Sequence, residues 1–212
     1  MLVLPLPAGG YNNHWTRNII ATAEAMIQAD LEAEAIAYVS KAVAAKPDET
    51  DLLFTLGSAH ERAGNHDAAE KAFLRLLEKH PDHAATLNYL GYMWAESGRN
   101  LEKAHEMLVR AVTQEPKNGA YVDSLGWVYF RLGNLELAEK YLTDATSLVP
   151  RDDPLVHPSV EPDRVAARAE GQPVEIDPRA HWLPPLATPD NSGPSGTGRA
   201  ERPGSAVSLR PG

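Results

Sequence analysis

Four prolines recur at an almost constant interval, and this spacing constrains the fold more than any other feature of the sequence. They are Pro47, Pro81, Pro116 and Pro150, and the intervals between them are 34, 35 and 34 residues. A fixed period of this length is typical of repeat architectures, in which each unit buries its apolar face against the next unit. The chain is therefore predicted to stack similar units rather than to fold around one central sheet.

The same residue types recur between the prolines. Three units share a Leu-Gly pair, a later alanine and a large apolar residue after it: Leu56, Gly57, Ala69 and Phe73; Leu90, Gly91, Ala104 and Leu108; Leu125, Gly126, Ala138 and Leu142. Small residues at such positions allow two helices to approach closely. An upstream unit, from about Thr16 to Asp48, keeps the register but has Ala23 in place of the glycine, and we count it as a degenerate fourth repeat.

A second glycine in each unit, at Gly64, Gly98 and Gly133, follows an amphipathic run and is suited to end a helix in the left-handed conformation. Each unit is thus predicted to be a helix, a turn and a helix. The predicted helices cover 17–28, 31–45, 50–62, 66–79, 84–97, 100–114, 119–131 and 135–148. The extra residue between the second and third repeat prolines is assigned to the turn at Arg99-Asn100.

In the last unit the pattern reads Leu125-Gly126, Tyr129, Gly133, Ala138, Leu142, Ala145 and Pro150. It resembles the tetratricopeptide repeat family, and the last two units are similar to the C-terminal repeats of longer bacterial members. The resemblance implies an all-α solenoid, a right-handed superhelix of about four repeats. Their expected bounds are 16–49, 50–83, 84–118 and 119–150. The sequence departs from the family pattern at Leu76, where alanine is usual, and at Ala23.

The two ends differ from the repeats. Residues 1–15 are predicted to be irregular, and they lack the basic start of a signal peptide, so we expect a cytoplasmic protein, or a periplasmic one if the chain is a fragment. Residues 151–212 hold eleven of the seventeen prolines and no lysine. Such a composition cannot offset its chain entropy, and a disordered low-complexity tail is predicted. The tail is either a natural extension or the product of a truncation or frameshift.

The net charge of −9 argues against nucleic-acid binding, which needs clustered basic residues, and it favours neutral or basic protein partners. No apolar run is long enough to cross a membrane. The chain has no cysteine, no His-Glu-x-x-His pattern and no nucleophile or phosphate-binding motif. His80 and His83 are interpreted as solvated loop residues, and Glu61 and Glu96 as part of a solvated helix face. We therefore expect no catalytic residue, no metal and no cofactor.

The resemblance also implies that the first helices of successive repeats line a concave groove. The register places there Asp51, Phe54, Ser58, Glu61 and Arg62 of the second repeat, and the candidate binding residues in the last two repeats are Asn88, Tyr92, Glu96, Asp123, Trp127 and Arg131. Asn88 could hold a peptide backbone, and Tyr92 and Trp127 either offer apolar contact to a ligand or pack between repeats. The lysine, asparagine and arginine residues with which some members bind chaperone carboxyl termini are replaced here by Phe54, Ser58, Tyr89, Ala120 and Ser124.

The predicted function is a non-enzymatic scaffold that binds a partner protein or an extended peptide in this groove. Two alternatives stay open. The chain could be a module that associates with its own copies through an uncapped last repeat, where Leu135, Leu142 and Leu148 would be exposed. It could also be a fragment of a larger repeat protein.

Overall fold

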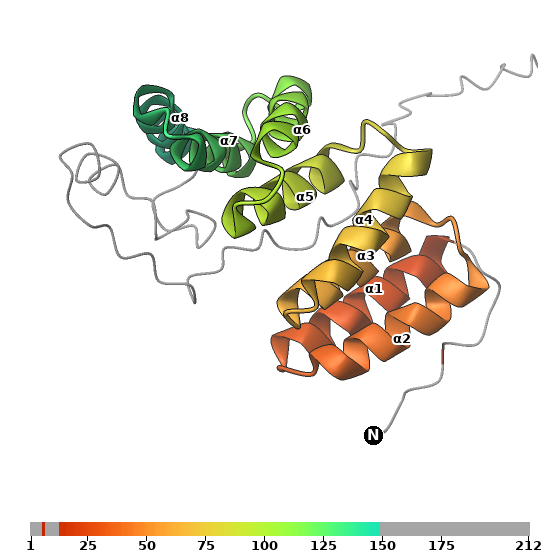
Figure 1. Cartoon of the computed structure of the whole chain (residues 1–212). Coiled ribbons are helices and arrows are strands. Elements are labelled where there is room, and N and C mark those ends of the chain that lie inside the picture. Colours follow the sequence, from red (N-terminus) through yellow and green to blue (C-terminus); the bar gives the residue numbers. More distant parts are fainter. Residues whose placement is uncertain (1–5, 7–12, 149–212) are drawn as a thin grey trace, which may run out of the picture.

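The structure, a computed structural model, describes residue 6 and residues 13–148, and within this part the chain forms eight α-helices and no strand. They are α1 (Asn13–Gln28), α2 (Glu32–Ala45), α3 (Thr50–Arg62), α4 (His66–Lys79), α5 (Ala84–Ser97), α6 (Leu101–Gln114), α7 (Gly119–Leu132) and α8 (Leu135–Leu148). Consecutive helices pair as hairpins, and the four hairpins stack in sequence order (Figure 1). The expected helical solenoid is confirmed, whereas the predicted tail at 151–212 lies outside the described residues.

The helix bounds differ from the predicted ones by at most one residue at each end except at the start of α1. This helix begins at Asn13, inside the segment that was expected to be irregular. Trp15 is buried in the core, and the Lys46 ammonium donates to the Thr16 hydroxyl over 3.4 Å, so the first turn is fastened to the loop after α2. The repeat register alone gave Trp15 no role.

The glycines of the repeat pattern lie where two helices of one hairpin touch. A Cβ atom added at Gly126 would lie 2.7 Å from Cγ of Leu142, and one added at Gly91 would lie 2.8 Å from Cγ of Leu108. Real side chains do not approach so closely, so the close helix contact predicted from the sequence is confirmed. The same contact buries Leu142 completely, and the expectation that it would be exposed on the last repeat is wrong. Leu135 is partly buried against the core, and Leu148 is 40% exposed.

The turns inside the hairpins follow the predicted chemistry. Gly98 and Gly133 end α5 and α7 with positive φ angles of 69° and 81°. Asn100 also has a positive φ, 49°, and α6 begins directly after it. The extra residue of the third repeat therefore lies in this turn, as predicted.

His83 is not the solvated loop residue that was expected. It is the N-cap of α5, where its Nδ1 atom accepts a hydrogen bond from the backbone N–H of Thr86 over 3.3 Å. Burial lowers the pKa of His83, and an imidazole that accepts at Nδ1 must be neutral at that atom. The histidine thus has a structural role as a helix cap.

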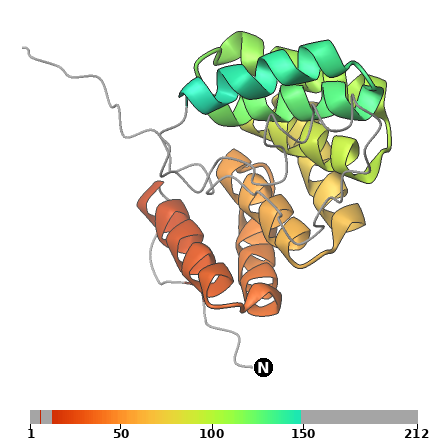
Figure 2. The ribbon, with the colours of Figure 1, turned by 90° about the vertical axis from the view of Figure 1, so that its left-hand side faces the viewer.

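The hairpins are not stacked equally tightly. α3 packs against α1 and α2, and α7 packs against α5 and α6, whereas the second and third repeats touch mainly through α4 and α5. α3 and α5 meet at few positions, and Figures 1 and 2 show α1–α4 and α5–α8 as two groups. An aromatic cluster bridges them, with ring centroids of Phe54 and Tyr89 5.2 Å apart and those of Phe73 and Tyr89 5.6 Å apart. The junction between repeats two and three is therefore the loosest in the array.

Two arginines tie the outer helices to the preceding repeat. Arg75 of α4 donates to the carbonyl oxygen of Pro47 over 2.7 Å. Arg110 of α6 donates to the carbonyl of Pro81 over 2.5 Å and to the carboxylate of Asp82 over 2.7 Å. Both arginines have the same place in their repeats, where the last repeat has Asp144. The periodic prolines thus supply carbonyl acceptors as well as helix ends.

Replacing Arg110 with alanine should lower the free energy of unfolding by about 1 kcal/mol, because a charged hydrogen bond to a backbone carbonyl is lost but the site is half exposed. Urea denaturation measures the change. Lys103→Ala, an exposed position on the same helix, serves as the control and should change little. Equal stability of both variants would show that the arginine link contributes nothing in solution.

Candidate functional site

The predicted groove residues come together on two adjacent helices. Asn88, Tyr92 and Glu96 follow one another at four-residue spacing on α5, and Asp123, Trp127 and Arg131 do so on α7. This spacing places each set along one side of its helix. Burial raises the pKa of the Tyr92 phenol, and the nearby carboxylates of Glu96 and Asp123 raise it further. The six residues thus lie on two adjacent helices, and we call this set the groove face; that it binds a ligand stays a prediction.

Asn88 is the first of the three groove-face residues on α5 and is 1% exposed. Neither its Nδ2 donor nor its Oδ1 acceptor has a hydrogen-bond partner among the described residues. A buried amide that makes no hydrogen bond costs about 1–3 kcal/mol for each unsatisfied group, which is why native proteins rarely contain one. The protein keeps at this position a donor and an acceptor that together match one peptide unit.

Asp123 faces the same surface from α7 and is 6% exposed. Its Oδ2 atom has no donor within the part of the chain that the structure describes. Burial disfavours the ionised carboxylate and raises its pKa to about 7. Near neutral pH this group can change between acceptor and donor according to what lies opposite it.

Trp127 and Arg131 are engaged by neighbouring groups of the protein. The indole of Trp127 is 1% exposed and stacks on Phe130 with ring centroids 5.2 Å apart. The guanidinium of Arg131 lies 5.6 Å from the Trp127 ring, and its Nη1 atom donates to the backbone carbonyl of Glu96 over 2.6 Å. Arg131 thus satisfies a carbonyl in the last turn of α5 and links repeats three and four. Roles for these two residues in ligand binding stay predictions.

Glu61 belongs to the same site, and its interpretation as a solvated carboxylate is wrong. It stands at the end of α3 and is 5% exposed, and its Oε2 atom has no hydrogen-bond partner among the described residues. Burial raises its pKa to about 7, although the neighbouring Arg62 opposes this shift. The repeat register could have indicated this burial, because Glu61 has the same place in its repeat as Ala95 and Phe130, which are also buried.

A pocket of about 150 Å³ opens at the loose junction between repeats two and three. Its lining residues come from α3, α4, α5 and the turn after α5, and they are Glu61, His66, Tyr92, Met93, Glu96, Ser97 and Arg99. An engineered cavity of about 150 Å³ binds one benzene molecule, whereas sites for cofactors and drug-sized ligands measure about 300–1,000 Å³. The pocket therefore has room for one side chain and not for a nucleotide cofactor.

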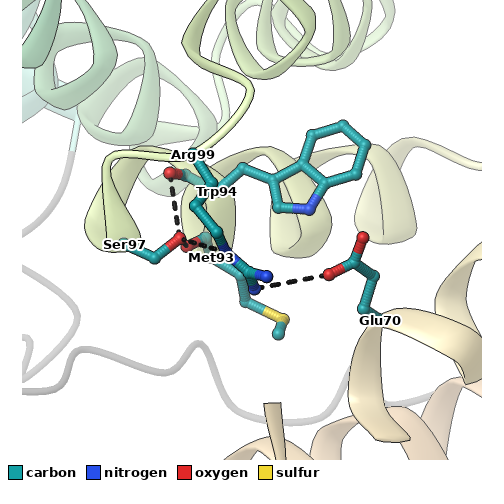
Figure 3. A network of polar contacts seen from close by, with 5 residues as sticks. All are labelled: Glu70, Met93, Trp94, Ser97 and Arg99. Atoms are coloured by element: carbon teal, nitrogen blue, oxygen red, sulfur yellow. Dashed lines mark hydrogen bonds and ion pairs between the residues drawn. The ribbon is translucent and has the colours of Figure 1, made fainter. Parts of the chain in front are cut away.

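A polar network orders one rim of this pocket (Figure 3). The Arg99 side chain reaches the Ser97 hydroxyl and the Glu70 carboxylate, each over 3.4 Å, and Ser97 in turn donates to the backbone carbonyl of Met93 over 2.9 Å. Glu70 lies on α4, so the network spans the junction. The carboxylate that pairs with Arg99, that of Glu70, therefore does not line the pocket.

Within residues 13–148, no group of three or more histidine, aspartate or glutamate side chains is arranged to hold a metal ion. None of the described helices is long and apolar enough to cross a membrane.

Comparisons with known proteins agree with the geometry. Models of the tetratricopeptide repeat match residues 54–102 and 123–152. A tetratricopeptide-repeat-containing protein of Pseudomonas aeruginosa is 30% identical over 135 residues, which make up 64% of this chain and 23% of that protein. The chain thus spans less than a quarter of the length of this relative.

Solved structures show the same fold at low identity. MamA of Desulfovibrio magneticus superposes with a TM-score of 0.61 at 18% identity, over 77% of this chain and 88% of that one. A thermophilic tetratricopeptide repeat protein of Thermus thermophilus gives a TM-score of 0.61 at 18% identity, over 74% and 84% of the two chains.

Proposed function

The chain belongs to the tetratricopeptide repeat family, whose arrays serve as protein-interaction scaffolds, and from this premise we propose that its groove face binds an extended peptide of a partner protein. The bound peptide runs across α5 and α7, and the protein contributes binding and no chemical step. The observation that carries this proposal is the buried amide of Asn88 on that face, which has no hydrogen-bond partner among the described residues.

An extended peptide supplies what the groove face lacks. Each peptide unit has one N–H and one C=O group, and the amide of Asn88 can accept from the first and donate to the second. A further peptide N–H can donate to the unpartnered oxygen of Asp123. Because these protein groups are already desolvated, a ligand that satisfies them recovers a cost that the free protein already carries.

The burial of Asn88 and Asp123 requires that the groove face opens before a peptide can reach them. The junction between repeats two and three suits this motion, since α3 and α5 make little contact there and the pocket at this junction is lined by Tyr92 and Glu96 of the groove face. Stability in a repeat array is a sum of neighbour interfaces, so the weakest interface opens first. Binding is then coupled to a small separation of the two halves of the array.

Peptides selected from a random displayed library by the full chain provide the test. Asn88→Ala should weaken their binding about tenfold or more, because one tenfold step corresponds to about 1.4 kcal/mol and two hydrogen bonds are lost. The same change should not lower the melting temperature, because it also removes an unsatisfied buried amide. Calorimetric titration measures the first effect and thermal denaturation the second.

The matched control is Gln114→Ala, an exposed amide on α6 away from the groove face. In the same binding assay, Trp127 should be replaced by phenylalanine and not by alanine. Truncating a buried tryptophan to alanine leaves a cavity that costs about 3–5 kcal/mol of stability. Undiminished affinity of Asn88→Ala, together with cross-links that map to the outer helices, would show that peptides bind elsewhere.

A further inference from the structure

Two carboxylates line the pocket at the loose junction, and each has one buried oxygen without a donor in the part of the chain that the structure describes. The Oε2 atoms of Glu61 and Glu96 are buried, and neither has a hydrogen-bond partner among the described residues. Glu61 is 95% buried and stands on α3, while Glu96 stands on α5, so the two groups face one cavity from opposite sides of the junction. A buried carboxylate without a partner has a high desolvation free energy, and a cation with N–H donors offsets it best through charge-assisted hydrogen bonds.

The other walls of the pocket suit the stem of a long basic side chain. Tyr92 and Met93 line it with aromatic and thioether surface, against which the methylene groups of arginine or lysine can pack. Arg99 and His66 also line the pocket, but the guanidinium of Arg99 is paired with Glu70 at its rim. The volume of about 150 Å³ admits one such side chain.

We propose that this pocket takes the arginine or lysine side chain of a bound peptide, with Glu61 and Glu96 as its counter-charges. The proposal rests on the proposed function, because the basic side chain belongs to the peptide that crosses the groove face beside it. Tyr92 joins the two sites, since it lines the pocket and lies on the groove face. The net charge of −9 favours the approach of a basic partner, so long-range attraction and the local site act in the same direction.

A single amino-acid derivative tests the pocket apart from the rest of the groove. The probe is N-acetyl-arginine methylamide, and its neutral isostere, N-acetyl-citrulline methylamide, is the matched control ligand. The reporter is the methyl carbon of Met93, one of four methionines in the chain, in protein labelled at methionine methyl groups. Its signal is assigned from the spectrum of Met93→Leu.

The arginine derivative should shift the Met93 methyl signal saturably in the full chain, and the citrulline derivative should not. Glu61→Gln and Glu96→Gln should each weaken the arginine effect at least fivefold. Glu106→Gln, an exposed carboxylate on α6, should leave it unchanged. The dispersion of the remaining methyl signals shows that each variant is folded, so a lost response reports on the pocket.

Equal responses to arginine and citrulline, or no response to arginine in the folded wild-type chain, would overturn the proposal. The peptide selection separates this failure from failure of the proposed function. Selected peptides that depend on Asn88 while the Met93 signal ignores arginine would refute the basic pocket alone. A Met93 response without any selected peptide would support the pocket and refute the peptide groove.

Discussion

Gly126→Leu should lower the free energy of unfolding by about 3 kcal/mol or more, at the upper end of the usual cost of overpacking. A Cβ atom at this position would lie 2.7 Å from Cγ of Leu142 and 3.0 Å from its backbone nitrogen. Because one of the two clashes involves backbone, α8 must move as a whole to relieve it. Urea denaturation followed by circular dichroism measures the loss.

The damage should extend beyond the mutated hairpin, because repeats are stabilised by their neighbours. Hydrogen exchange should quicken in α5 and α6 as well as in α7 and α8. Glu139→Leu, which adds a leucine at an exposed position of α8, controls for composition and should change stability little. An unaltered unfolding midpoint for Gly126→Leu would mean that α7 and α8 do not approach in solution as they do here.

Asp123→Asn should stabilise the protein increasingly as the pH rises from about 4 to about 8. Burial raises the pKa of Asp123 to about 7, whereas an unfolded aspartate titrates near 3.9. Between these values the native state binds more protons than the unfolded state, so the wild-type chain loses stability as the pH rises. At about 1.4 kcal/mol per pKa unit, the variant gains at most about 4 kcal/mol at pH 8 and almost nothing at pH 4.

The difference between variant and wild type is the quantity to measure, because other groups titrate in the same range. Burial lowers the pKa values of His60 and His83, so these residues remove stability as the pH falls and oppose the trend of Asp123. The control is Asp144→Asn, at an exposed position of α8, whose stability should follow that of the wild type at each pH. A constant offset between Asp123→Asn and wild type across this pH range would show that Asp123 is not a desolvated carboxyl group.

The expected gain in stability also bears on function. A buried carboxyl group that weakens the fold at neutral pH is retained more readily if a ligand uses it, since sites for ligands commonly cost stability. A peptide N–H that donates to Asp123 would favour its ionised form and lower its pKa. Peptide binding should then release protons near pH 7, which calorimetry in buffers of different ionisation enthalpy detects.

The helices of this protein could be predicted almost to the residue because their signals are local. Gly98 ends α5 through its own φ angle, and the repeat prolines prevent the outer helices from continuing. The close contacts at Gly91 and Gly126 were also predictable, since a fixed repeat brings the same pair of positions together each time. The exception at the start of α1 includes Trp15, which is buried in the core, and burial of a single residue before the repeat register begins leaves no periodic signal.

The register also placed Asn88 and Asp123 at equivalent positions of neighbouring repeats, because the interval between them equals that between Gly91 and Gly126. It could not show that their polar atoms would be buried without partners, or that Arg131 would be held by the carbonyl of Glu96. Such features depend on how neighbouring repeats tilt and fill space. The environment of Glu61 was missed for the same reason, since a carboxylate on an amphipathic helix is usually solvated.

Spacing along the chain was enough to predict the repeat period, the helices, the glycine contacts and the residues that share one side of each helix. Only the tertiary structure decided that the four repeats pack unequally. The loose junction between repeats two and three, and the pocket that Glu61 and Glu96 line there, arise where α3 and α5 meet at few positions. The distance between α3 and α5 depends on how side chains such as Phe54, Phe73 and Tyr89 fit together, and the repeat period does not encode that fit.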